Sequence, residues 1–171
     1  MTVDMHLQPE ALFSAMLFTN VKNMKALTDM IKKGEINAAL IKPSMILDMF
    51  HVKVAVNKSK RAELNKKMVT RGIFGEIIYN LSPYRKISEA FGAYGINAND
   101  TSLLAILLDD ESGAIKSDLL NKIEGDEVDL SLLSQFSNHS EIAKFFKLDN
   151  YQSHEHLSKF VSSSIACKAL L

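Results

Sequence analysis

Basic side chains gather in the middle of the chain, between Lys53 and Lys86. This stretch carries nine lysines and arginines but only two acids, Glu63 and Glu76. Amide and hydroxyl side chains and the ring of Tyr84 lie among these cations. Cations bind phosphates, amides and hydroxyls bond to phosphates, sugars or base edges, and aromatic rings stack on bases. These residue types can make nucleic-acid contacts, but a charge run is usually a solvated helix face, so both interpretations stay open here.

A second stretch, residues 97–133, has the opposite charge. It carries nine aspartates and glutamates but only two basic residues, Lys116 and Lys122. The whole chain is neutral, with 20 basic and 20 acidic residues. A neutral chain with two oppositely charged parts can offer two faces to two partners.

The residue patterns of common catalytic and cofactor sites are missing from the sequence. No Gly-x-Gly or Gly-Lys-Ser/Thr run is present to cradle a phosphate. None of the five histidines has a second histidine four residues on, and the one cysteine, Cys167, has no cysteine partner for a metal. We expect Cys167 to be a small buried side chain. The sequence therefore predicts that the protein is not an enzyme and has neither a cofactor nor a metal site. The rival hypothesis is a small hydrolase.

The same features predict a soluble protein of the cytosol and nucleus. One cysteine cannot form an internal disulfide, which suits a reducing compartment. The N-terminus lacks the charge and hydrophobicity pattern of a secretory signal. The longest apolar run, Leu103 to Leu108, is too short to cross a bilayer. No membrane partner is expected.

Hydrophobic periodicity predicts one α+β or α/β domain over residues 1–171. It would hold a small mixed or antiparallel sheet of about three to four strands, covered by six or seven helices. The expected strands are 11–18, 39–41 and 102–108, with a brief edge strand near Val128. The expected helices are 24–33, 44–66, 72–80, 87–94, 118–123, 141–146 and 155–170. Ser44 is the expected N-cap of the long helix, and Gly95 the expected left-handed end of the helix before it.

Several segments together resemble the family of PRPK-binding subunits of the KEOPS, or EKC, complex. The most specific segments lie between Asn57 and Ser102. They are Asn57-Lys58, Thr70-Arg71, Glu76 to Pro83, Ile87 to Ala90 and Gly95 to Ser102. Weaker similarity extends over nearly the whole chain and includes Val21-Lys22-Asn23 and Glu124-Gly125.

The resemblance implies a non-catalytic subunit that binds the atypical kinase/ATPase PRPK and supports its activity. It also implies help in recruiting tRNA, through the single-stranded acceptor end, for threonylcarbamoyladenosine formation beside the anticodon. A pure protein scaffold that holds the kinase without touching RNA is the alternative. The kinase-binding surface cannot be assigned from the sequence. The candidate tRNA-binding residues are Lys53, Asn57, Lys58, Lys60, Arg61, Lys67, Thr70, Arg71, Glu76, Asn80, Ser82, Pro83, Tyr84, Arg85 and Lys86.

Some of these candidates have a purely structural alternative. Arg71 could pair with Glu76, and Ser82-Pro83 could cap the helix that follows. The chain also departs from the family pattern after Pro83. Tyr84-Arg85-Lys86 stands where relatives carry an asparagine-rich loop, so positive charge replaces amides there.

Overall fold

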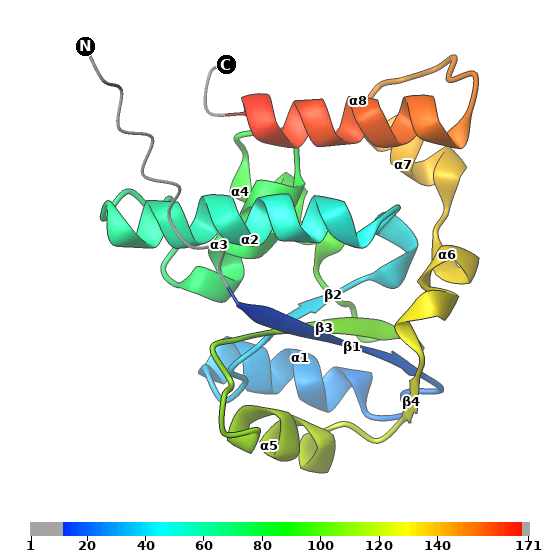
Figure 1. Cartoon of the computed structure of the whole chain (residues 1–171). Helices are drawn as coiled ribbons and strands as arrows, with labels where there is room; N and C mark the ends of the chain where they lie inside the picture. Colours follow the sequence, from blue (N-terminus) through cyan, green and yellow to red (C-terminus); the bar gives the residue numbers. More distant parts are fainter. Residues whose placement is uncertain (1–11, 169–171) are drawn as a thin grey trace.

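The computed structural model describes residues 12–168, which form an antiparallel sheet between layers of helices (Figure 1). The strand order is β2-β3-β1-β4. The strands are β1 (Phe13–Thr19), β2 (Ala39–Ile41), β3 (Leu103–Leu108) and β4 (Asp126–Val128). The helices are α1 (Met24–Lys33), α2 (Met49–Leu64), α3 (Ile73–Leu81), α4 (Ile87–Tyr94), α5 (Ala114–Lys122), α6 (Leu133–Phe136), α7 (His139–Phe145) and α8 (His154–Cys167).

These elements confirm the predicted α+β class, and the sheet is antiparallel rather than mixed. The described residues hold eight α-helices, whereas six or seven were expected. The additional helix is α6, a single turn of four residues that is too short to produce a hydrophobic period. Two 3-10 turns, η1 (Pro43–Met45) and η2 (Leu130–Leu132), complete the fold.

The central strand β3 explains why the sheet has helices on both faces. All six of its residues are buried, and successive side chains of a strand point to opposite faces. Leu104 and Ile106 belong to a core shared with α2, α3 and α8, while Leu103 and Ala105 belong to a core shared with α1 and α5. The uninterrupted apolar run of β3 is therefore required, because a polar residue at any of these positions would be buried.

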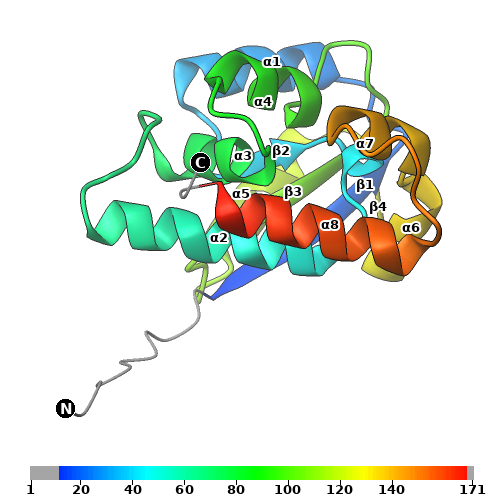
Figure 2. The same cartoon turned by 90° about the horizontal axis from the view of Figure 1, so that it is seen from above.

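The helices that carry the predicted site lie on one side of the sheet. In Figure 1, α1 and α5 cover the lower face, and α2, α3 and α8 cover the upper one. Figure 2, seen from above, shows α8 running beside α2 in the same direction. The contacts agree, because His51 on α2 meets Ser158 on α8, and Lys58 meets Ile165 about two turns further along both helices.

The start of the long helix differs from the prediction. Ser44 lies in η1, and α2 begins after Asp48, whose carboxylate accepts a hydrogen bond from the Phe50 amide at 2.8 Å. Pro43 sits at the first position of η1, where its fixed φ favours a short tight turn. Asp48 therefore replaces Ser44 as the N-cap.

The prediction of a left-handed residue at Gly95 is also wrong. Gly95 is extended, with φ −70°, because the chain leaves α4 to pair with the edge strand β2. The Lys42 amide donates to the Tyr94 carbonyl at 2.8 Å in this pairing. A Cβ at position 95 would lie 2.7 Å from the Phe91 carbonyl oxygen, so close approach, and not positive φ, favours glycine.

The two outlying segments of the resemblance meet in space. The Lys22 amide donates to the Glu124 carbonyl at 2.9 Å, and the Glu124 amide donates to the Asn23 side-chain oxygen at 3.1 Å. A Cβ at Gly125 would lie 2.8 Å from a Val21 methyl carbon. These residues therefore join the end of β1 to the start of β4.

Within residues 12–168, no helix combines the length and the apolar character that crossing a bilayer requires.

Candidate functional site

The two helices that carry most of the predicted site, α2 and α3, are joined through buried polar groups. The Asn80 amide donates to the Ser59 hydroxyl at 2.9 Å, and that hydroxyl donates to the Ala55 carbonyl at 2.8 Å. Asn80 is 6% exposed, and Ser59 is fully buried. Asn80, a candidate tRNA-binding residue, therefore holds the two helices together in this structure.

Glu76 organises the loop between α2 and α3. Its carboxylate accepts hydrogen bonds from the amides of Val69 and Thr70, at 3.0 and 2.8 Å, and from the Thr70 hydroxyl at 2.7 Å. Glu76 is 2% exposed, so it faces the loop and not solvent. These bonds fix the Thr70-Arg71 turn. The alternative in which Arg71 pairs with Glu76 has no such contact within residues 12–168, where the carboxylate binds the loop and Arg71 is exposed.

Lys58 connects α2 to the end of α8. Its ammonium donates to the carbonyl of Ile165 at 2.5 Å and to that of Ala166 at 3.5 Å. These are last-turn carbonyls, which lack partners within the helix and carry its negative dipole end. Desolvation lowers the pKa of Lys58 from its usual value, and a smaller opposing effect comes from Cys167. Cys167 itself is exposed, which contradicts the expectation of a buried thiol.

A cavity of about 730 Å³ opens where α2, α3, their connecting loop and the end of α8 meet. We call it the basic cavity. Six of the predicted residues line it, namely Lys58, Arg61, Lys67, Glu76, Asn80 and Arg85. Among these six, the fold brings together cations that are 27 positions apart in the chain, Lys58 and Arg85.

Two further residues of the basic cavity, Tyr79 and Lys168, were not predicted from the sequence. The Lys168 amine donates to the Tyr79 carbonyl and lies 3.3 Å from the centre of the Tyr79 ring. Burial lowers the pKa of Lys168 to about 7, and Lys58 adds to this effect while Glu76 opposes it. The only sequence signal was a lysine at the end of a helix, which usually indicates interaction with the helix dipole.

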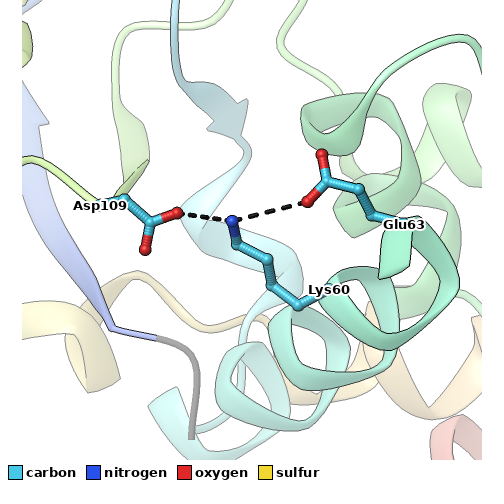
Figure 3. A network of polar contacts seen from close by, with 3 residues as sticks. All are labelled: Lys60, Glu63 and Asp109. Carbon is cyan, nitrogen blue, oxygen red and sulfur yellow. Dashed lines mark hydrogen bonds and ion pairs between the residues drawn. The ribbon is translucent and has the colours of Figure 1, made fainter. Parts of the chain in front are cut away.

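Lys60 lies outside the basic cavity and has an internal partner. Figure 3 shows its ammonium between Asp109, at 2.5 Å, and Glu63, at 3.5 Å. The hydrogen bond to Asp109 is the main reason that the pKa of Lys60 is raised. Asp109 follows β3 directly, so this contact ties α2 to the end of the central strand.

The loop after α3 is attached to α7. The buried Ser82 hydroxyl accepts from the Tyr84 amide at 3.1 Å, and the Tyr84 hydroxyl donates to the Phe145 carbonyl at 2.7 Å. Pro83 is half-buried between them. The Lys86 ammonium lies 3.6 Å from Glu89, and both side chains are exposed. Lys86 takes the N-cap position of α4, so Ser82 supports this loop rather than capping that helix.

The remaining predicted residues, Lys53 and Asn57, are half-buried on α2, one turn apart. Both take part in further contacts within the protein. They are not among the residues that line the basic cavity.

A second hollow, of about 440 Å³, lies over the edge strand β2 and has a different character. We call it the apolar groove. Its walls come from α1, α3 and α4 and include Ile31, Phe74, Ile78, Phe91 and Ile96. Among the described residues that line it, Lys32 alone is charged.

The basic cavity has the chemistry of an anion site. Among the described residues, no group of three metal-ligating side chains is close enough to hold a metal ion. Exposed Arg61, Lys67 and Arg85 offer cations, and an aromatic ring lies behind them. This combination suits a phosphate backbone with unpaired bases.

Comparison with known proteins assigns a family to this architecture. The family model described as kinase binding protein CGI-121 matches residues 18–169. The chain belongs to the CGI-121 family of kinase-binding proteins.

Several relatives in this family are similar over most of their length. The chain is 37% identical to the EKC/KEOPS complex subunit TPRKB of Danio rerio over 149 residues, 86% of this chain and 85% of that protein. It is 29% identical to the EKC/KEOPS complex subunit cgi121 of Aspergillus fumigatus over 140 residues, 77% and 74% of the two chains. The family predicted from residues 57–102 is confirmed by these findings.

Proposed function

We propose that this member of the CGI-121 family is a non-catalytic subunit of a KEOPS/EKC complex. In this role it binds a PRPK-type atypical kinase/ATPase and supports its activity. It also helps to recruit tRNA by its acceptor end for threonylcarbamoyladenosine formation beside the anticodon. The family description and the names of the relatives support the kinase and the complex. We place this function in the cytosol and nucleus.

The observation that carries the tRNA part is the basic cavity. Arg61, Lys67 and Arg85 come from three different segments and converge on one hollow, and none of them forms an ion pair within residues 12–168. Arginines keep their charge at all physiological pH values and bind phosphates in a bidentate way. A hollow lined by cations, beside amide and aromatic groups, suits single-stranded RNA better than a duplex, whose bases are stacked.

The scaffold alternative also has an observation in its favour. Lys58, Lys60 and Lys86 each contact groups of the chain itself, so part of the basic segment serves the fold. If all the cations acted in this way, the chain would hold the kinase without touching RNA. The exposed cations of the basic cavity argue for the tRNA-binding function.

Binding of a single-stranded RNA with an acceptor-end sequence, measured over a series of salt concentrations, tests the tRNA part. Each phosphate contact contributes about −0.7 to the slope of log affinity against log salt for single strands. We expect Arg61→Ala combined with Arg85→Ala to make the slope shallower by about 0.7 for each phosphate that the arginines no longer bind. Lys33→Ala, on the exposed end of α1, is the matched control. An identical slope in the double variant would favour the scaffold alternative.

Recovery of the kinase tests the other part. The full-length chain, expressed with an affinity tag in cells, should retain a PRPK-type kinase identified by mass spectrometry. Absence of that kinase, with other KEOPS subunits also absent, would contradict membership of the complex.

A further inference from the structure

The ring of Tyr79, on α3, is covered in the free chain by the side chain of Lys168. Lys168 follows α8 directly, and its amine lies over the ring at 3.3 Å from the centre. The same amine donates to the Tyr79 carbonyl. Tyr79 is 8% exposed and Lys168 is 4% exposed. A base could therefore stack on this ring only after the amine has moved.

The charges around Lys168 make this arrangement sensitive to a bound anion. Lys58, on α2, faces the amine and repels its charged form, while Glu76, on α3, attracts it. Arg85 acts on the Tyr79 hydroxyl and tends to lower its pKa, against burial and Glu76, which raise it. Of the effects on the Lys168 pKa, the attraction by Glu76 is smaller than the burial and the repulsion by Lys58 that oppose it.

Desolvation and the charge of Lys58 both disfavour the protonated form of the Lys168 amine. They lower its pKa to about 7, so near neutral pH a substantial fraction of the amines is uncharged. A phosphate bound in the basic cavity would place a negative charge near the Lys168 amine. This charge would favour the protonated amine and raise the pKa of Lys168. Binding of the anion would then be coupled to uptake of a proton from solvent.

From this geometry we propose that Lys168 is a proton-linked gate of the basic cavity. In the free chain the amine covers the Tyr79 ring. When a single-stranded RNA binds, the amine takes up one proton and moves from the ring to a phosphate, which frees the ring for an unpaired base. This proposal rests on the proposed tRNA function and adds its regulation. No covalent bond changes, and the only species exchanged with solvent is the proton.

The gate predicts how RNA affinity depends on pH. Below about pH 7 the amine is already charged, so affinity should change little. Above about pH 7 the amine must take up a proton from solvent when RNA binds. Affinity should therefore fall by about fivefold between about pH 7 and about pH 8 if the bound amine stays charged. Lys168→Met keeps most of the unbranched side chain but cannot take up a proton, so this fall should disappear. Lys168→Arg is charged at every pH and should also lose it.

The experiment measures the affinity of a single-stranded RNA with an acceptor-end sequence across neutral pH. It compares the wild-type chain, Lys168→Met, Lys168→Arg and the control Lys33→Met, which lies on α1. In the wild-type chain, NMR of the lysine side chains follows the Lys168 amine with and without RNA, which requires no variant to fold. We expect a midpoint near pH 7 that rises when RNA is added, and a movement of the amine away from the ring.

The possible outcomes separate the gate from the function on which it rests. RNA binding with an unmoved Lys168 midpoint, or with the same pH dependence in Lys168→Met, overturns the gate and leaves the tRNA function standing. A failure of RNA to bind at any pH and low salt overturns both. A raised midpoint together with a pH-independent Lys168→Met variant supports the gate.

Discussion

The two sides of α3 line two hollows of opposite character. Glu76, Tyr79 and Asn80 face the basic cavity, whereas Phe74 and Ile78 face the apolar groove. Both sets come from one nine-residue helix, because neighbours along a helix point in different directions. The difference shows that a single short helix can line a polar cavity on one side and an apolar groove on the other.

The two sides also differ in how their residues are held. On the basic side, polar groups are fixed by hydrogen bonds, such as those of Glu76 to the loop and of Asn80 to Ser59. On the apolar side, the groove is shaped by side-chain packing, and Phe91 and Ile31 remain 38% and 40% exposed. Hydrogen bonds are directional, so we expect the basic side to depend on single residues more steeply than the groove does.

Loss of the Glu76 carboxylate should have the largest effect on stability and on the basic side of α3. Glu76→Ala leaves the amides of Val69 and Thr70 without their acceptor, and the Thr70 hydroxyl keeps only the Gly72 carbonyl. We expect the free energy of unfolding to fall by about 3 kcal/mol. The loop that carries Lys67 should then lose its fixed shape, and RNA affinity should fall as well. Denaturant unfolding and RNA titration measure the two effects.

The control for this variant is Glu89→Ala, which removes the exposed pair with Lys86. An exposed ion pair contributes about 0–1 kcal/mol, so stability should hardly change. Equal losses in the two variants would show that Glu76 is not the residue that organises the loop.

The Asn80–Ser59 bond should have the next largest effect. Asn80→Ala removes a buried donor between α2 and α3, and we expect a loss of about 1–2 kcal/mol in unfolding free energy. In a double-mutant cycle with Ser59→Ala, the coupling energy should be about 1 kcal/mol because the two groups share one bond. Additive losses would mean that this hydrogen bond contributes nothing of its own.

A smaller effect concerns the pH dependence of the contact between the N-terminal parts of α2 and α8. Burial of His51 lowers its pKa from 6.5, against opposing effects of the Ser158 carbonyl and Asp48, while His154 adds to the lowering. The unfolded chain therefore takes up a proton more readily than the folded chain does. The contribution of His51 to the free energy of unfolding is therefore full above about pH 6.5. It decreases as the pH falls towards the pKa of His51 in the folded chain.

We expect His51→Gln to reduce the loss of unfolding free energy on acidification, measured by denaturant unfolding at several pH values. His139→Gln is the control, because its ring lies 5.1 Å from His154 but outside the contact with Ser158. The same acid dependence in wild type and His51→Gln would contradict this account.

The smallest effect should come from the apolar groove. Phe91→Ser, and separately Ile31→Ser, change the groove while leaving every residue of the basic cavity in place. RNA affinity should stay within about twofold of wild type, because stacking and phosphate contacts lie on the other side of α3. A larger decrease in affinity would show that the two sides are not independent.

The sequence predicted the strands, most helices and the basic segment, because hydrophobic period and charge are local properties. It could not show which cations face solvent. Lys58 bonds to a carbonyl 107 positions away, and Lys60 pairs with an aspartate 49 positions away. These partners come together only through packing of α2 against α8 and against the end of β3. Such long-range contacts cannot be predicted from the local sequence pattern of hydrophobicity and charge.

Tyr79 and Lys168 illustrate the same limit for the site itself. Tyr79 lies within the segment that carries the family resemblance, but a buried aromatic residue in a helix usually belongs to the core. Lys168 is 89 positions away and was expected only to belong to a final helix. Its contact with the ring depends on where α8 ends relative to α3.

The most direct test of the central claim is to map the RNA contact on the chain residue by residue. The isotope-labelled chain is titrated with a single-stranded acceptor-end RNA, and backbone and side-chain NMR shifts are followed. The account predicts that the largest changes fall on Arg61, Lys67, Tyr79, Arg85 and Lys168, with little change at Ile31 and Phe91. Changes centred on the apolar groove, or no saturable change at low salt, would contradict it.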